Sequence, residues 1–346
     1  EAFLIGGGMR FQSAVLDDNG KPDRAAIKMI EDGWNRHCET PHFDLGRRLN
    51  FYDMQGLAAR QQMETGDFMF QKAYHTGRPR RGQYSNFCLG ALDPTQLTDS
   101  VASDVNNNAV IAGVEVDQRT AEAKRYHFAT NSDDYYGYEG GLGFSLESES
   151  VLHGYHMLRP NQVRGVTPFA SAIILAYHLQ DYIHAEVSVQ KANSKFLAFV
   201  TATQGQRGSF NNVKKGDTSA GDVFAKYSDA LEYCSMQFLE PGESVEFNTA
   251  TRSSQGLQDF SGLIHRMTAA AARLPVEIIS GDYRDLNYTT IRAARNDFKQ
   301  GLKPRWRRFN TQFNRPTFDE WLRTEWASGR MPLKGYAKDP SRYHKG

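Results

Sequence analysis

Apolar residues recur at every third or fourth position along several stretches of the chain, and this spacing predicts amphipathic helices. The clearest stretch covers residues 285–313, where the apolar stripe consists of Ile291, Ala294, Phe298, Leu302, Trp306, Phe309 and Phe313. Gly301 and Pro304 lie in the middle of the stripe. Since proline lacks a backbone donor and clashes with the preceding turn, we expect a kink or a short break at this point.

A second long helix is predicted over residues 168–202, which contain no proline after the first residue and no glycine. Thr167 is a suitable N-cap for it, and proline is well tolerated at the first helical position. A helix of this length is unusual, so a break near Asn193 is the alternative. Shorter helices are predicted within the first 75 residues and over residues 257–273.

Strands are predicted at three places in the first half of the chain: 68–74, 109–117 and 123–129. The last two flank a turn-like segment and are expected to form a β-hairpin. The polar, Gly-rich and Tyr-rich residues 131–150 predict a loop. Residues 204–222 hold four glycines and few apolar residues, which indicates an exposed excursion. The pair Pro241-Gly242 suits a tight turn between two further strands.

Composition does not single out a functional class. The 346 residues include 41 Lys and Arg against 40 Asp and Glu, for a net charge of +1, so any role in binding nucleic acid must be local. No run approaches the roughly 18 apolar residues of a membrane span, and no membrane partner is expected. The three cysteines are scattered, which argues against a disulfide framework and fits a reducing compartment.

Positive charge is concentrated in one place. From Arg284 to Arg315 there are nine Lys or Arg residues against two acids, Asp285 and Asp297. Basic residues beside an apolar stripe are also what any solvated helix face shows. The pattern therefore leaves open whether this face meets solvent, nucleic acid or a protein partner.

The motifs of several enzyme classes are absent from the sequence. There is no GxxxxGK[ST] phosphate loop, no HExxH and no pair of CxxC motifs, so neither a P-loop ATPase nor a zinc site is indicated. We expect no cofactor and no metal. Glu122 and Lys124, which follow Asp117, superficially resemble the acid-x-Lys pair of some nucleases. Such an enzyme needs several converging carboxylates, and a surface hairpin of mixed charge explains the same residues.

Three segments, in this order and spacing, resemble the lambda-type portal proteins of tailed bacteriophages: VRGV at 163–166, LEPGESVEF at 239–247 and PVEIISGDYRDLNYTTIR at 275–292. The segments GWNRHC at 33–38 and 114–128 are also similar to that family. Two positions depart from the family pattern. Thr167 separates VRGV from the proline that would follow directly, and Arg273-Leu274 stand where a small, Gly-containing turn is common.

The resemblance implies an α+β, mainly helical, portal-type subunit that assembles into a ring, usually of twelve copies. It divides the chain into a wing at 1–166, a wing and stem helix at 167–203, a clip at 204–250, a returning stem helix at 251–275, and a tunnel loop, long kinked helix and C-terminal wing or crown segment at 276–346. The ring would lie at one capsid vertex, and DNA would be packaged and ejected through it. No catalytic site is implied.

The resemblance also implies roles for particular residues. The tunnel-loop region would contain Gly281, Asp282, Tyr283, Asn287 and Tyr288. The DNA channel or the subunit interface would contain Arg284, Arg292, Arg295, Lys299 and Lys303. Lys214 and Lys215 would contact other proteins from the clip.

The implied partners are other copies of the chain, double-stranded DNA bound without regard to sequence, the terminase large subunit, a head-tail adaptor, and the major capsid and scaffolding proteins. The implied location is the portal vertex of the virion, reached from the host cytoplasm during assembly. Two alternatives stay open at this point. One is a metal-dependent nuclease or other DNA-processing enzyme that uses Glu122 and Lys124. The other is a soluble helical adaptor without nucleic-acid contact.

Overall fold

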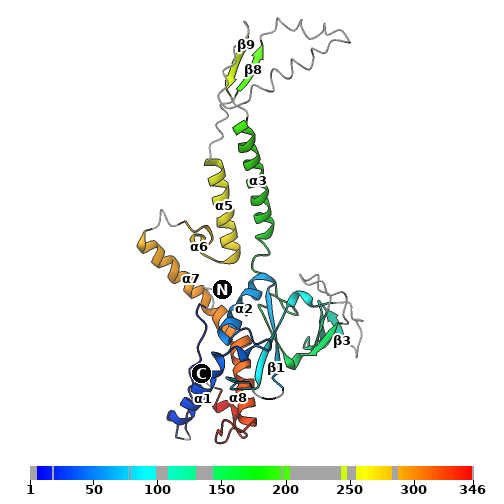
Figure 1. Ribbon diagram of the computed structural model, residues 1–346, viewed down its shortest axis with the longest axis vertical. Helices are drawn as coiled ribbons and strands as arrows, with labels where there is room; N and C mark the ends of the chain where they lie inside the picture. The colour runs from blue at the N-terminus through cyan, green and yellow to red at the C-terminus, as the bar shows by residue number, and fades with distance from the viewer. Residues whose placement is uncertain are drawn as a thin grey trace. The chain divides into compact units, whose positions relative to one another are not determined.

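A computed structural model describes residues 6–17, 19–76, 78, 80–98, 108–129, 143–195, 198–202, 243–247, 255–282 and 287–344 (Figure 1). The chain divides into two units. The first unit consists of Glu1–Ile173 and Thr268–Gly346, and the second unit is Ile174–Met267. Helices and small antiparallel sheets are both present, which confirms the predicted α+β class.

Two helices open the first unit, as the sequence predicts. Helix α1 (Arg24–Cys38) begins where the Asp23 carboxylate accepts a hydrogen bond from the backbone N–H of Ala26. Helix α2 (Phe51–Glu64) begins with a capping box, because Asn50 and Asp53 each accept a hydrogen bond from the other's backbone N–H. Such caps satisfy backbone donors that a helix leaves unpaired at its start.

A three-stranded antiparallel sheet follows α2. Its central strand β1 (Asp67–Tyr74) confirms the strand predicted at 68–74 and pairs on one side with β2 (Phe87–Leu92) and on the other with β7 (Val151–Tyr155).

A second antiparallel sheet has the order β3 (Asn108–Ile111), β4 (Val114–Asp117), β5 (Ala123–Phe128), β6 (Phe144–Glu147). The predicted hairpin is present as β4 and β5. The prediction of one strand over 109–117 is wrong, because Ala112 and Gly113 have φ angles of 50° and 80° and turn the chain back on itself. The predicted loop at 131–150 is also wrong at 144–147, where β6 pairs with β5.

The C-terminal helices contain the clearest predicted stripe. Helix α5 (Gln255–Ala272) confirms the helix expected at 257–273, and a short helix α6 (Val276–Ser280) follows it. Helix α7 (Tyr288–Phe309) continues through a π-helix (Asn310–Asn314) into α8 (Arg315–Ala327).

A kink or a short break was expected at Gly301 and Pro304; α7 is continuous there, so the break does not occur, and an irregular turn lies further along the helix, at 310–314. Both residues are exposed on α7. Pro304 therefore removes one backbone hydrogen bond at a surface where water can satisfy the freed carbonyl.

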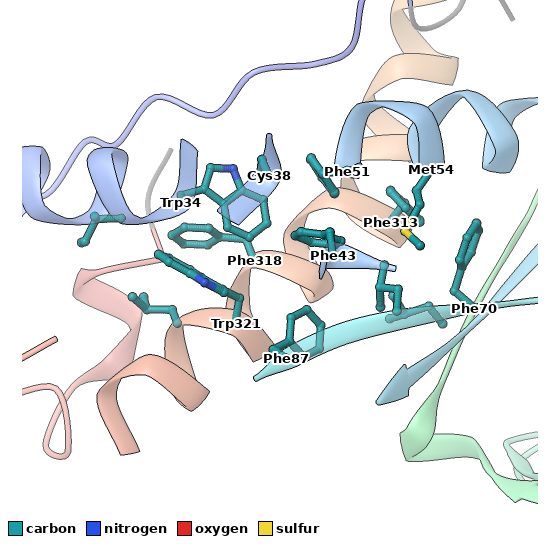
Figure 2. Close-up of a cluster of buried hydrophobic side chains, with 14 of the residues drawn as sticks. Trp34, Cys38, Phe43, Phe51, Met54, Phe70, Phe87, Phe313, Phe318 and Trp321 are labelled. Atoms are coloured by element: carbon teal, nitrogen blue, oxygen red, sulfur yellow. The ribbon is translucent and has the colours of Figure 1, made fainter. Parts of the chain in front are cut away.

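The main core of the first unit joins helices and strands that are far apart in the sequence (Figure 2). The ring of Trp34 in α1 lies 5.1 Å from that of Trp321 in α8 and 5.1 Å from that of Phe51 in α2. Phe313, in the π-helix, stacks on Phe51 and meets Phe70 of β1 edge-on at 5.1 Å. Burying each such side chain contributes about 1.5–3 kcal/mol, so this aromatic cluster holds α1, α2, α8 and the first sheet together.

The second unit contains α3 (Ile173–Lys195) from Ile174 onward, β8 (Ala198–Ala202), β9 (Glu243–Phe247) and the part of α5 up to Met267. The helix predicted over 168–202 begins at Ile173 instead of Pro168, and the prediction is also wrong beyond Lys195, close to the break considered near Asn193. Residues 198–202 form β8, which pairs antiparallel with β9. The pairing joins segments 41 or more residues apart and overrides the local helical pattern. The excursion at 204–222 and the turn at Pro241-Gly242 lie outside the described residues.

Candidate functional site

The basic face of α7 is open to solvent. Four of the predicted channel or interface residues are exposed on this helix: Arg292, Arg295, Lys299 and Lys303. The ion pairs within the described ranges pair none of them with a carboxylate. The apolar stripe on the same helix packs inward through Leu302 and Phe309, which are buried. The helix is thus anchored by its stripe and presents four cations that have no carboxylate partner among the described residues of the single chain.

The predicted tunnel-loop residues lie at the junction between α6 and α7. Gly281 ends α6 with a left-handed φ of 66°, and the backbone N–H of Asp282 donates to Ser280 Oγ at 3.2 Å. Asn287 is the N-cap position of α7, and the following Tyr288 is 74% exposed. Two predicted residues of this region, Tyr283 and Arg284, lie outside the described residues, as do Lys214 and Lys215.

Helix α3 exposes apolar side chains on opposite sides. Ile174 is 66% exposed and Ile183 is 41% exposed. These two residues are nine positions apart, so at 100° per residue they project in opposite directions. Tyr177 and Val187 are exposed as well. These apolar residues alternate with exposed polar ones such as Gln180 and Asp181, so α3 offers apolar surface on more than one side, which other protein segments could cover.

Within the second unit, one side of α3 is covered by α5. The rings of Tyr182 and Phe260 lie 4.5 Å apart, and the two helices run side by side (Figure 1). Yet α5 also exposes Leu263 and Met267. The pair of helices therefore leaves apolar surface uncovered on both of its members. We call the exposed apolar residues of α3 and α5 the uncovered face: Ile174, Tyr177, Ile183, Val187, Leu263 and Met267.

None of the helices in the described part of the chain is long and apolar enough to cross a membrane.

A buried polar network, which the sequence analysis did not identify, joins the two sheets of the first unit. The Asp67 carboxylate on β1 is fully buried and accepts hydrogen bonds from the guanidinium of Arg164. The same guanidinium donates to the carbonyl of Ala112, in the β3–β4 turn, at 3.2 Å and to the carbonyl of Pro94 at 2.9 Å. His153 Nε2 lies 3.3 Å from Asp67, and Tyr126 of the second sheet donates to His153 Nδ1 at 3.1 Å.

The charge of Asp67 is retained in spite of its burial. Burial by itself would raise the pKa of this carboxyl, but hydrogen bonds from His153 and Arg164 lower the pKa to about 2. Burial lowers the pKa of His153, so the ring is neutral and can donate through Nε2 while accepting at Nδ1. Arg164 is therefore the counter-ion of an otherwise isolated buried charge.

Two glycines deliver Arg164 to this position. A Cβ on Gly165 would come within 2.0 Å of the carbonyl oxygen of Gly66, and one on Gly66, which has a φ of 98°, would come within 2.4 Å of the backbone of Val166. The segment VRGV therefore packs backbone against backbone on the turn before β1. The motif VRGV could be recognised in the sequence, but the sequence did not indicate that Arg164 pairs with Asp67, which lies 97 residues away.

The residues of the nuclease alternative lie on an exposed turn. Lys124 Nζ pairs with Glu122 Oε2 at 2.5 Å, and both side chains are exposed. The Asp117 carboxylate accepts hydrogen bonds from the backbone N–H groups of Arg119 and Thr120 and so caps the turn. Within the described ranges, no group of three or more His, Cys, Asp or Glu side chains is arranged to hold a metal. The geometry gives this alternative no support.

The family model described as phage portal protein, lambda family, matches residues 1–305, and the chain therefore belongs to this family. The resemblance stated from the sequence is confirmed. The family is one of structural portal proteins that are not enzymes.

Individual relatives are distant. The chain is 21% identical over 305 residues to the portal protein of Escherichia phage N15. This alignment covers 82% of this chain and 56% of the phage N15 protein. The chain is also 20% identical over 296 residues to portal protein B of Escherichia phage lambda. This alignment covers 79% of this chain and 54% of the phage lambda protein. The chain thus spans about half the length of the curated relatives it matches.

A solved structure described as the neck of a native GTA particle, computed with C12 symmetry, has a similar fold. The TM-score is 0.52 at 9% sequence identity, and the match covers 96% of this chain and 94% of that chain. At this identity the likeness concerns the fold alone.

Proposed function

We propose that this chain is a portal subunit that assembles with copies of itself into a ring at one vertex of a phage capsid, and that DNA enters and leaves through this ring. The observation that carries the proposal is the uncovered face of α3 and α5. Apolar side chains on opposite sides of one helix need partners on more than one side, and a closed ring supplies a neighbour on each side of every subunit. Family membership gives the proposal its biological setting.

A ring of twelve copies is the most economical form of the proposal. The GTA neck whose chain shares this fold is described with C12 symmetry. In a cyclic ring each subunit uses two different surfaces, head to tail, and every contact repeats around the axis. A charged residue that faces the axis in one copy therefore becomes a charged annulus in the ring.

The parts of the subunit are assigned as the resemblance implies. Residues 1–166 form the wing, 167–203 the wing and stem helix, 204–250 the clip, 251–275 the returning stem helix, and 276–346 the tunnel loop, long helix and C-terminal wing or crown segment. Strand β9 falls within the proposed clip, and its partner β8 falls at the end of the preceding 167–203 segment, while α3 and α5 fall within the proposed stem. The uncovered face then belongs to the stem, where neighbouring subunits would meet.

The exposed cations of α7 would serve DNA passage, subunit contact or both. Arg292, Arg295, Lys299 and Lys303 have no carboxylate partner within the described residues, so they are available to phosphates or to acids of a neighbour. Contacts to phosphates position a duplex without reading its sequence, as a passive conduit requires. Arg284 and the tunnel-loop residues Gly281 to Tyr288 would adjoin the same passage.

The remaining partners follow from the same role. The terminase large subunit, which would supply ATP hydrolysis, and the head-tail adaptor would dock on the clip, with Lys214 and Lys215 among the contacts. The major capsid and scaffolding proteins would contact the outside of the ring. The chain would be found at the portal vertex of the virion, and in the host cytoplasm before assembly.

The test is whether the uncovered face holds the ring together. Native mass spectrometry or negative-stain imaging of the purified chain should show large closed rings. The double substitution Ile174→Ser and Ile183→Ser should abolish them, since both side chains are exposed in the single chain and would be buried only between copies.

The single-chain fold should survive this change, as measured by circular dichroism. Gln180→Ser, at an exposed polar position of the same helix, is the matched control and should leave the rings intact. Rings that persist in the double variant would show that α3 is not the assembly surface. A wild-type chain that stays monomeric would contradict the proposed function itself.

A further inference from the structure

A groove of about 830 Å³ lies on the first unit, between residues 156–171, the corner that joins α5 to α6, and helix α7. Four basic side chains line it: His156, Arg273, Arg305 and Arg308. They come from three segments that are distant in the sequence, so the fold gathers them. Its walls also include apolar residues such as Leu158, Val166 and Pro275.

The positive charges in the groove act on one another. The pKa of Arg305 is lowered, first by burial and then by the neighbouring charges of Arg273 and Arg308. Burial also lowers the pKa of His156, and the same three arginines lower it further. Arg305 Nη2 donates to the carbonyl of Ala272 at 3.3 Å, which holds one guanidinium in the groove. The four groups are thus packed together at an electrostatic cost.

No ion pair within the described residues offsets this cost. Glu277 and Asp297 line the same groove, but neither forms an ion pair with the arginines in the part of the chain that the structure describes. Partly buried charges are normally paired, because removing them from water is otherwise unfavourable. The groove therefore has the chemistry of a site whose anion comes from outside the chain.

The backbone at Arg273 adds an independent sign of use. This residue adopts a left-handed φ of 55°, which is uncommon for any residue other than glycine, asparagine or aspartate. A glycine would fit the corner between α5 and α6 without strain. An unfavourable backbone conformation of this kind motivates a hypothesis of function, and the side chain of Arg273 lines the groove.

We propose that this groove is the docking site for a carboxylate-bearing segment of a second copy of the chain. The inference rests on the proposed ring and names one of its contacts. The mixed lining favours a peptide over a duplex, because a segment of protein can place acids on the arginines and apolar side chains on Leu158, Val166 and Pro275. DNA presents phosphates without apolar side chains to match that wall.

The charge balance of the chain fits a second copy as the source of the acid. The sequence holds 41 Lys and Arg and 40 Asp and Glu, so an identical neighbour carries enough carboxylates to supply one to every groove. In a closed ring each copy gives its acidic segment to one neighbour and receives one from the other. The surplus of bases around α7 is then compensated between copies, which accounts for a local excess in a chain that is nearly neutral.

Cross-linking can test the contact directly. In the Arg308→Lys variant, a carbodiimide should join the introduced amine to any carboxylate that lies against it. Rings assembled from an equal mixture of unlabelled and ¹⁵N-labelled chains distinguish contacts between copies from contacts within one chain. We expect mass spectrometry to find peptides that contain position 308 joined to an acidic peptide of the other isotope. Arg307→Lys, on the same helix but outside the groove, is the matched control and should give few such products.

A second measurement uses loss of charge. The double variant Arg305→Gln and Arg308→Gln should raise the dissociation constant of the ring by roughly tenfold or more, the effect of losing about one charged hydrogen bond. Arg307→Gln should leave it unchanged. The single-chain fold of each variant is followed by circular dichroism.

Three results would overturn the inference while leaving the proposed ring standing. In the first, the amine introduced at position 308 couples only to Glu277 or Asp297 of its own chain. In the second, intact wild-type-like rings give no coupling at all. In the third, the double variant assembles normally but retains less duplex DNA, which would make phosphate the occupant. Absence of rings in the wild-type protein would instead remove the proposed function together with this contact.

Discussion

At the scale of single residues, Asp67 shows how the first unit tolerates a buried charge. Its carboxylate is held between Arg164 and His153, and the guanidinium continues to carbonyls at Pro94 and Ala112. The Arg164 side chain thereby links β1 to the second sheet. A charge in such a place is strongly destabilising when its partner is removed, because the remaining group is left buried and unpaired.

Asp67→Asn is expected to lower the free energy of unfolding by about 3–5 kcal/mol, since Arg164 would lose its counter-ion in the interior. Denaturant titration followed by circular dichroism measures the change. Glu64→Gln is the control, because its ion pair with Arg60 is exposed and worth at most about 1 kcal/mol. Equal effects of the two substitutions would mean that the network has no structural role.

His37 makes the first unit sensitive to acid. Burial lowers the pKa of this side chain from an unfolded value near 6.5 to about 3. Between these values the unfolded state binds the proton and the folded state does not, so stability falls as the pH drops below 6.5. At 1.36 kcal/mol per pH unit, acidification from 6.5 to 5 should cost about 2 kcal/mol from this group.

The substitution His37→Leu should therefore make the unfolding free energy less dependent on pH between 6.5 and 5, although His153 will leave part of the dependence in place. Denaturant midpoints measured at pH 8, 6.5 and 5 give the comparison. The same slope in variant and wild type would show that His37 titrates normally in the folded protein.

At the scale of secondary structure elements, α7 combines an anchored stripe with an exposed basic face. Leu302 and Phe309 fix the helix, while Arg292, Arg295 and Lys299 project into solvent. Such an arrangement can hold cations toward a passing duplex or toward a neighbouring subunit, and the two roles differ in their response to salt.

Replacing Arg292, Arg295 and Lys299 by Gln should weaken ring assembly and make DNA association by the remaining rings less sensitive to salt. Each phosphate contact contributes about 0.9 to the log–log slope, so the loss of three contacts would reduce the slope by about 2.7. Fluorescence anisotropy with a duplex between 50 and 200 mM salt measures it. Normal rings with an unchanged slope would identify the cluster as a solvated helix face.

Elements with strong local periodicity were predictable from the sequence. This holds for α1, α2, α5 and most of α7, and for β1 and the β4–β5 hairpin. The elements that were predicted wrongly share one cause. Strands β6 and β8 are determined by pairing with other strands, and the turn at Ala112-Gly113 by backbone geometry, more than by the local sequence pattern. Pro304 does not interrupt α7, because the carbonyl that it frees lies on an exposed part of the helix.

The candidate site was predictable only in part. Exposure of the predicted cations on α7 agrees with their position off the apolar stripe. The groove arginines Arg305 and Arg308 lie on the same helix, but their burial depends on Arg273 and on residues near 156, far away in the sequence. The buried charge of Asp67 is likewise stabilised by Arg164, which lies 97 residues later. Such pairs cannot be inferred from one sequence without the fold.

At the scale of the whole molecule, two surfaces of the single chain lack a partner among the described residues. The uncovered face leaves apolar surface on α3 and α5, and the arginines of the groove form no ion pair among the described residues. In the proposed ring, copies of the same chain would cover the apolar surface and supply carboxylates to the groove. Membership of the lambda portal family is consistent with the proposed ring.

The π-helix at 310–314 constrains how the gene can change. A π-turn contains one residue more than an α-helical turn, so deleting one codon there would restore regular helix. A one-residue deletion in a regular turn of α7 or α8 would rotate the rest of the helix by about 100°, whereas the same deletion within the π-turn leaves α8 in its register. Trp321 would then keep its place in the aromatic cluster, and Gln55 would lose its 2.8 Å hydrogen bond only if the deleted residue were Asn314. Single-codon deletions should therefore be tolerated best at 310–314 in descendants of the gene, while such deletions elsewhere in α7 and α8 should be eliminated.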